Sequence, residues 1–112
     1  MTASDRQNEL LRAKINLETS QIPWRELLRY FAAGDVICVS DDLDLVDVAM
    51  RISTDDTESV AQWMAQNRVA KVSDAQAAAW LEADTALWAV VVRPWILVQQ
   101  NKHLQDRAAL PR

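Results

Sequence analysis

The sequence predicts an α+β fold, with a winged-helix-like order of helices and a small antiparallel sheet of about three strands. Apolar residues recur at helical spacing in five segments, and short β-branched runs lie between them. The expected order is helix, helix, strand, helix, helix, strand, helix, strand. Half of the 112 residues are hydrophobic, which favours one folded domain over a disordered chain.

We expect three parts along the chain: an N-terminal amphipathic helix in residues 1–20, a winged-helix-like core in 21–98, and a frayed polar tail in 99–112. The N-terminal helix is expected over about residues 5–18, because apolar residues fall there at helical spacing among charged ones. Its predicted buried stripe consists of Leu10, Leu11, Ile15 and Leu17.

The core is predicted to begin with a helix and a short buried strand. Pro23 suits the first turn of the helix, where its missing N–H costs nothing, and residues 20–22 are expected to be a break before it. Gly34 suits the end of the helix, because glycine adopts a positive φ readily. The run Val36–Val39 is apolar on both faces and predicts the strand.

Two helices joined by a tight polar turn are expected next, as in a winged helix-turn-helix. Asp41 or Asp42 is expected to cap the third helix, which runs to about Ser53. The turn at 54–56 supplies an aspartate that can cap the fourth helix, which ends near Asn67.

The end of the core is predicted to be a wing with an inserted helix. Residues 69–72 predict a short strand, and an alanine-rich helix is expected over about 73–83, capped by the serine or the aspartate at its start. Residues 87–98 are strongly strand-forming. Pro94 interrupts this run, so it marks an edge position, a bulge or a break between two strands.

Acidic residues are concentrated in the middle of the chain. The formal charge is −4, and residues 34–68 carry eight acidic side chains against two basic ones. In a winged helix-turn-helix the second helix of the pair enters the DNA major groove, where phosphates have to be neutralised. The fourth helix has the wrong charge for this, so the sequence argues against nucleic-acid binding. The expected acidic surface consists of Asp44, Asp47, Asp55, Asp56 and Glu58.

No group of residues in the sequence indicates catalysis, a metal or a cofactor. Cys38, the single cysteine, lies in an apolar strand where thiols are usually inert, which argues against a nucleophilic pair with His103. The aspartates at 41–47 carry oxygen ligands for a hard cation, but they lack the glycine and the distal glutamate of a calcium loop. Helix capping explains them better. We therefore expect no catalytic residue, metal site or cofactor.

The final strand-forming run is predicted to lie at an interface. If it is one continuous strand, Trp88 and Trp95 lie on opposite faces, and both faces are apolar. The domain's own helices can cover one face, whereas the other needs the N-terminal helix or a second copy of the chain. This pattern favours a homodimer. The expected interface residues are Trp88, Val90, Val92, Arg93, Trp95 and Ile96.

The run from Leu87 to Trp95 has the distinctive sequence Leu-Trp-Ala-Val-Val-Val-Arg-Pro-Trp. The sequence also contains several shorter motifs: Ile22-Pro23-Trp24, Leu27, Phe31–Gly34, Leu43–Val46, Val48-Ala49, Asp55-Asp56, Trp63-Met64, Val69–Val72 and Trp80-Leu81. In these residues the chain resembles a small bacterial family catalogued as domain of unknown function 2288, over about residues 11–99. The resemblance implies a stand-alone, soluble bacterial domain, and it brings no assigned activity and no catalytic residue.

The sequence therefore predicts a cytoplasmic bacterial protein that acts as a non-catalytic interaction or regulatory module, as a homodimer or with an unidentified protein partner. We expect no membrane association, because no apolar run approaches the roughly 20 residues of a membrane span and residues 1–8 lack the apolar core of a signal peptide. Two alternatives stay open: a DNA-binding winged helix-turn-helix protein, and a metal- or small-ligand-binding protein.

Overall fold

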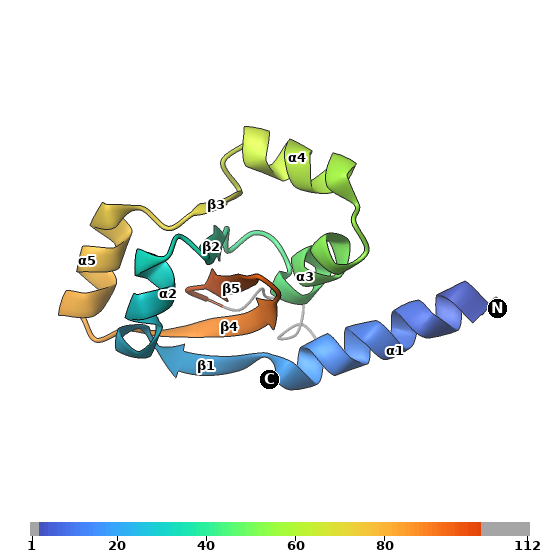
Figure 1. Cartoon of the computed structure of the whole chain (residues 1–112), viewed down its shortest axis with the longest axis horizontal. Coiled ribbons are helices and arrows are strands. Elements are labelled where there is room, and N and C mark those ends of the chain that lie inside the picture. The colour runs from blue at the N-terminus through green and yellow to red at the C-terminus, as the bar shows by residue number, and fades with distance from the viewer. Residues whose placement is uncertain (1–2, 102–112) are drawn as a thin grey trace, which may run out of the picture.

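The chain folds into helices arranged around one mixed β-sheet (Figure 1). The computed structural model describes the backbone of residues 3–101 and the side chains of residues 6–101. Within this part, no helix has both the length and the apolar composition needed to cross a membrane. The elements are α1 (Ala3–Glu18), β1 (Ser20–Pro23), the 3-10 helix η1 (Trp24–Leu27), α2 (Leu28–Ala32), β2 (Val36–Val39), α3 (Leu45–Ser53), α4 (Thr57–Ala65), β3 (Val69–Lys71), α5 (Asp74–Glu82), β4 (Ala86–Val92) and β5 (Trp95–Gln99).

The sheet has five strands, in the order β1-β4-β5-β2-β3, so the expectation of about three strands was wrong. β2 and β5 run parallel and the other neighbours run antiparallel, which makes the sheet mixed. β1 lies where we expected a break before Pro23, since a proline at the end of an edge strand does not interrupt the hydrogen-bond ladder. The final run is divided at Arg93-Pro94 into β4 and β5, which form a hairpin.

The two strands that flank α5 are not neighbours in the sheet. Within residues 3–101, β3 pairs with β2 at one edge, whereas β4 lies between β1 and β5. The helix at α5 is therefore a crossover between separate parts of the sheet, and not an insertion in a wing made of β3 and the last strand. The α+β class is confirmed.

The helices α4 and α5 begin with the predicted capping chemistry. The carboxylate of Asp56 accepts a hydrogen bond from the Ser59 N–H at 3.2 Å at the start of α4. Ser73 and Gln76 form a reciprocal capping box at the start of α5. These side chains satisfy backbone donors that have no partner inside the helix.

The cap of α3 lies later than predicted. Asp44, and neither Asp41 nor Asp42, accepts a hydrogen bond at 3.0 Å from the backbone N–H two residues on. Asp41 instead accepts two hydrogen bonds from Asn101, and Asp42 pairs with Arg68 at 2.7 Å. Both earlier aspartates thus tie the loop before α3 to other segments of the chain.

Four helices end with a residue at positive φ. Gly34 ends α2 as predicted, with φ 81°, and three non-glycine residues do the same for α3, α4 and α5: Asp55, Asn67 and Asp84, with φ of 58°, 59° and 51°. In each case the N–H of this residue and that of the next donate to carbonyls three and five residues earlier. This is the Schellman arrangement, in which glycine is the usual residue.

Each face of the sheet carries its own hydrophobic cluster. On one face, α1 and α3 pack on the strands, with Ile15 and Leu97 among the buried residues. On the other face, η1 and α5 provide Trp24 and Trp80, whose ring centroids lie 5.1 Å apart, and these pack with Ile96. Helices of the same chain thus cover both faces of the β4–β5 hairpin except at its turn end, where Val91 is 55% exposed.

The turn at Arg93-Pro94 decides which side chains share a face. Val92 pairs with Trp95 across the hairpin, and Trp88 has the same parity as Val92. Trp88 and Trp95 therefore face α1 and α3 together, whereas Ile96 faces the opposite side. The two tryptophans would lie on opposite faces only along one continuous strand; the break at Pro94, one of the predicted alternatives, brings them to the same face.

The helix α1 buries only part of its predicted stripe. It extends away from the sheet toward its N-terminus (Figure 1), and it packs through the half-buried Leu11 and the buried Ile15. Leu10 and Leu17 point away from the core and are 64% and 85% exposed. These two leucines lie seven residues apart, on one side of the helix.

Candidate functional site beside the β4–β5 turn

The structure divides the predicted interface residues between the core and the surface. Val90 and Ile96 are buried on opposite faces of the sheet. Arg93 lies in the turn and is exposed. The others are half-buried beside the α1–α3 cluster: Trp88, Val92 and Trp95. The part of this set that another molecule can reach is the turn end of the hairpin.

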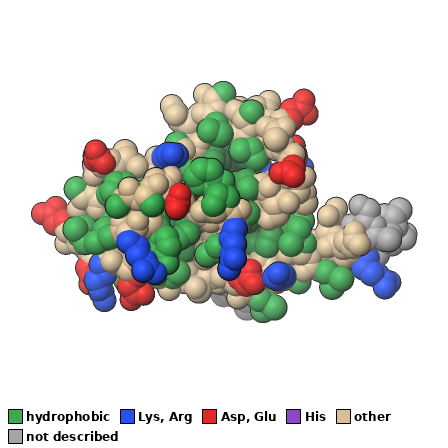
Figure 2. All heavy atoms as spheres, in the orientation of Figure 1, with side chains coloured by type: hydrophobic (Ala, Val, Ile, Leu, Met, Phe, Trp, Pro, Cys, Tyr) green, Lys and Arg blue, Asp and Glu red, His purple; other side chains and the backbone are tan. Residues whose placement is uncertain are grey.

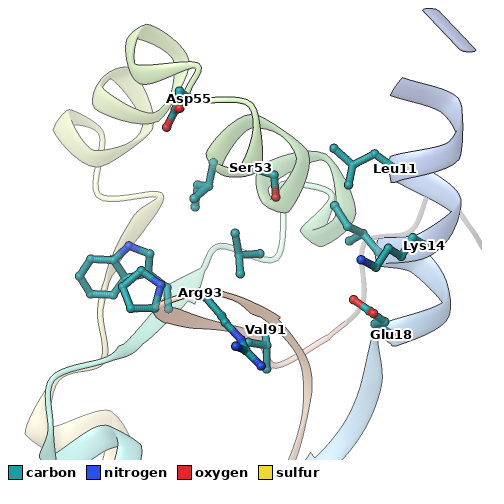
Figure 3. Close-up of a pocket in the computed structure, with 12 residues that line it drawn as sticks. Leu11, Lys14, Glu18, Ser53, Asp55, Val91 and Arg93 are labelled. Carbon is teal, nitrogen blue, oxygen red and sulfur yellow. The ribbon is translucent and has the colours of Figure 1, made fainter. Parts of the chain in front are cut away.

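A groove of about 880 Å³, here called the first groove, lies between α1, the end of α3 and the hairpin turn (Figure 3). Its apolar lining comes from all three elements. Figure 3 shows Lys14 and Glu18 extending from α1, with Ser53 and Asp55 at the end of α3. The apolar lining residues are Leu11, Ile15, Ile52, Val91, Val92, Pro94 and Trp95.

The charged residues around the first groove have no charged partner within the described part of the chain. Among the described side chains, Lys14, Glu18, Asp55 and Arg93 take part in no ion pair and no side-chain hydrogen bond. Two are basic and two are acidic, so the rim is balanced overall. On the face shown in Figure 2, hydrophobic side chains gather beneath α4, with basic and acidic side chains around them.

A second groove of about 500 Å³ lies on the other side of the same hairpin. It shares Glu18, Val91, Arg93 and Pro94 with the first groove. Its remaining lining comes mainly from η1, α2 and the opposite face of the sheet: Ile22, Leu27, Tyr30, Asp35, Ala89, Val90 and Ile96. The two grooves therefore meet at the outer edge of β4.

β1 does not pair with that edge beside Val91. β1 pairs with β4 only as far as Ser20, which lies opposite Ala89, and β4 continues beyond this point. Ile96, opposite Val91, donates its backbone N–H to Asp35 on the other side of β5 at 2.9 Å. Opposed residues of an antiparallel pair exchange both backbone hydrogen bonds or neither. The N–H and C=O of Val91 therefore point outward, past the end of β1.

Most residues of the predicted acidic surface cap helices or form ion pairs within the chain. Asp44 and Asp56 are helix caps. Asp47 lies 3.2 Å from Arg12 and 3.7 Å from Arg51, and Arg51 also bonds Asp56 at 2.9 Å. Capping and pairing account for three of the five predicted residues.

The pKa of Asp56 is lowered, and the cause is local. The hydrogen bond from the Ser59 N–H lowers it most, followed by the hydrogen bond from the Arg51 guanidinium. Both interactions favour the ionised carboxylate. Asp56 is therefore ionised at neutral pH, and its carboxylate stabilises the start of α4.

The outward surface of α4 carries no base that could meet a phosphate. The helix contains no Lys or Arg, and Glu58, Gln62 and Gln66 lie exposed along or beside it. The nearest basic residues, Arg51 and Arg68, are held by aspartates of the same chain. The exposed side of α4 is therefore acidic or neutral, and DNA phosphates do not attract such a surface.

Comparison with known proteins adds a family to this geometry. The family described as protein of unknown function (DUF2288) matches residues 10–100. The chain belongs to this family. The NMR solution structure of PA1075 from Pseudomonas aeruginosa is 41% identical in sequence and superposes with a TM-score of 0.73, covering 91% of this chain and 92% of that one. Comparison with curated proteins gave no match.

Membership in the DUF2288 family confirms the resemblance found in the sequence. Neither the family nor the Pseudomonas structure brings an activity with it, so no functional residue can be carried over. The function of this DUF2288 protein has to be argued from its own side chains.

Cys38 is half-buried, and its surroundings do not activate it. Burial raises the pKa of the Cys38 thiol, and the Gln76 amide at 3.7 Å opposes this effect only in part. His103, its proposed base, lies outside the described residues. Among those residues, no group of three or more His, Cys, Asp or Glu side chains is placed to hold a metal ion.

Lys14, Glu18 and Val91 were not among the predicted site residues. The signal for α1 was present, since positions 11, 14, 15 and 18 share one side of a helix. The exposure of Val91 had no such signal, because it depends on where β1 stops beside β4.

Proposed function

We propose that this DUF2288 protein is a non-catalytic protein-interaction module whose partner binds at the turn end of the β4–β5 hairpin. The observation that carries the proposal is the first groove. Seven of its twelve lining residues are apolar, and its four charged side chains have no partner among the described residues. An apolar centre with a polar rim is the usual composition of a protein interface.

The residue types in the groove also support a protein partner. Trp95 and Arg93 both line the groove near the turn, and tryptophan and arginine are enriched among the residues that dominate binding energy. Trp95 is partly buried by its own chain, which fixes its ring before a partner arrives. A side chain that is already ordered loses little entropy on binding.

The test is retention of a partner from a lysate of the source organism. The chain is immobilised as wild type, as the double variant Lys14→Ala/Arg93→Ala, and as the matched control Arg29→Ala. Arg29 is exposed on α2, away from the first groove. We expect the wild type and the control to retain the same protein and the double variant to lose it. Retention by all three forms, or by none, would contradict the proposal.

A second copy of the chain is the other candidate partner. The strand residues predicted for a homodimer include Val90 and Ile96, which lie in the chain's own core, so the dimer hypothesis now depends on other residues. Leu10 and Leu17, both exposed on one side of α1, favour a helix-to-helix contact.

Light scattering at several concentrations tests the homodimer. A dimer mass that the double variant Leu10→Lys/Leu17→Lys converts to a monomer mass would support it. A monomer mass for the wild type at every concentration would exclude it. The first groove lies on a different side of α1, so this result leaves the main proposal standing.

DNA binding is the alternative that follows from the helix-turn-helix order of α3 and α4. We infer that this pair does not serve that purpose, because the acidic surface opposes the electrostatic attraction that supplies most of the affinity for DNA. Retention on a DNA column that falls steeply with salt would contradict this inference. We also place the protein in the cytoplasm, where a lone cysteine stays reduced; cell fractionation tests the location.

A further inference from the structure

We infer that two copies of the chain associate through their α1 helices, which lie parallel and in register. This pairing develops the homodimer hypothesis of the proposed function, and the first groove takes no part in it. Three features of α1 support it: an apolar stripe that faces away from the core, the heptad spacing of that stripe, and two charged residues that flank it without an ion pair.

One side of α1 is apolar and exposed. Leu10, Ala13 and Leu17 are all exposed, and residues three and seven positions apart lie along one side of a helix. Leu11 and Ile15, which pack on the core, lie on the other side of α1. The helix also extends away from the sheet toward its N-terminus (Figure 1), so a second helix can reach the exposed stripe.

The spacing of the stripe is the one that joins helices in a coiled coil. In a heptad abcdefg, positions a and d form the contact between the two helices. Leu10 and Leu17 occupy successive a positions, and Ala13 occupies the d position between them. Arg6 occupies the preceding d position, so the apolar contact ends one turn before Leu10. From Leu10 to Leu17 it spans about 10 Å along the helix axis.

The charges beside the stripe match a second copy of the same helix. Glu9 occupies a g position and Lys14 an e position, and neither takes part in an ion pair among the described side chains. In a parallel pair, a g residue lies beside the e residue five positions on in the other helix. Glu9 of each copy therefore meets Lys14 of the other copy. The two-fold axis forms this ion pair twice, and a two-fold dimer needs such a self-complementary surface.

An antiparallel pair fits the charges less well. In that orientation e positions face e positions and g positions face g positions, so Lys14 of one copy would lie beside Lys14 of the other. Both Glu9 side chains would then lack a basic partner. The other flanking residues, Gln7 and Asn16, are neutral and favour neither orientation. The charges therefore select the parallel orientation.

The dimer contact is short and therefore weak. Two leucines and one alanine from each helix bury less area than a standard protein interface, and exposed ion pairs add little affinity. We expect a reversible dimer with a dissociation constant of about 0.1–1 mM. The two hydrophobic clusters lie within one chain, so the domain does not need the second copy for its core.

Disulfide linking tests the orientation of the pair. Cys38→Ala removes the single thiol and provides the background. In it, Leu10→Cys and Leu17→Cys should each link to themselves under oxidised glutathione, because a positions of a parallel pair lie opposite each other. The matched control is Asn8→Cys, which is exposed on the side of α1 that faces α3 and should stay unlinked. Linking only in a mixture of Leu10→Cys with Leu17→Cys would show an antiparallel pair and overturn the inference.

Charge reversal tests the ion pairs, with sedimentation equilibrium as the measurement of the dissociation constant. Glu9→Lys should raise this constant about fivefold or more, because two attractions become two repulsions. Glu9→Lys/Lys14→Glu exchanges the charges and should restore the wild-type constant. Glu26→Lys makes the same change of net charge at an exposed position in η1 and should dimerise like wild type. Failure of the double variant to restore dimerisation would contradict the parallel pair.

The outcomes separate this pairing from the proposed function. A wild-type monomer at every concentration, or equal dissociation constants for Glu9→Lys and wild type, would overturn the pairing. Neither result affects the first groove, because Glu9, Leu10 and Leu17 do not line it. Retention of a partner from the lysate decides the proposed function on its own. Thermal melting verifies that each variant folds.

Discussion

Charge serves different purposes in two regions of this protein. In the α3–α4 region, acidic side chains cap helices and meet arginines, as Asp56 does with the start of α4 and with Arg51. Around the first groove, Lys14 and Arg93 are exposed to solvent and have no partner among the described residues. The comparison teaches that charge density in a sequence does not locate a site. The acidic residues of the α3–α4 region stabilise the fold, and we propose that the region around the first groove binds a partner.

If hydrogen-bonded polar side chains stabilise the fold, replacing one that is fully buried should lower the free energy of unfolding most. Gln99 is buried, and its amide donates to the backbone carbonyls of Ser40 and Leu43, at 2.8 and 2.6 Å. We expect Gln99→Leu to lower the free energy of unfolding by about 2 kcal/mol, because the Leu43 carbonyl loses its side-chain donor and the Ser40 carbonyl keeps only the Leu43 N–H. Urea denaturation measures this. The exposed neighbour serves as a control, since Gln100→Leu should change little; equal effects of the two changes would contradict the prediction.

The next effect concerns Asp56. Asp56→Ala removes both a helix cap and an ion pair, so the urea midpoint should fall, and it should fall more than in the control Glu58→Ala. The pKa of Asp56 is lowered in the fold. Its contribution is therefore complete above the unfolded pKa of about 3.9 and is lost as the pH falls through the lower folded pKa. The difference between wild type and variant should shrink at pH 3. An unchanged difference would show that the carboxylate charge contributes nothing.

Local chemistry made much of the fold predictable. The helix of Val46 and Ala49, the cap at Asp56 and the end at Gly34 follow from spacing and from side-chain chemistry within a few residues. β1 and the face of Trp95 did not follow, because both depend on strand pairing between distant segments. The break at Arg93-Pro94 was among the predicted alternatives, but only the pairing of β4 with β5 shows that it brings Trp95 to the face of Trp88.

The candidate site was predictable only in part. Arg93 and Trp95 were identified because they interrupt and end an unusual apolar run. Lys14 and Glu18 were not, since only the fold brings α1 beside the hairpin. An acidic surface was predicted because acidic residues are concentrated in this stretch. In the structure, Asp44 caps α3 and Asp47 pairs with Arg12.

Asp55 offers a smaller test, because it is a free charge held in a strained backbone. Its φ is 58°, in a region that favours glycine, and Asn67 has φ 59° at the equivalent place after α4. We expect Asp55→Gly and Asn67→Gly each to raise the free energy of unfolding by about 0.5–1 kcal/mol. Asp55 lines the first groove and Asn67 does not. Only Asp55→Gly should therefore weaken partner retention; equal retention by both variants would remove Asp55 from the site.

Replacing Lys14 or Arg93 should change the stability least, although we expect these changes to weaken partner binding most. Lys14→Ala and Arg93→Ala should each change the free energy of unfolding by less than about 0.5 kcal/mol, because neither side chain has a polar partner among the described residues. Urea denaturation of both variants measures this beside the partner assay. A loss as large as that of Gln99→Leu would mean that these charges hold the fold after all, and the distinction between engaged and free charge would fail. Unchanged stability together with lost retention is the result that only a binding site explains.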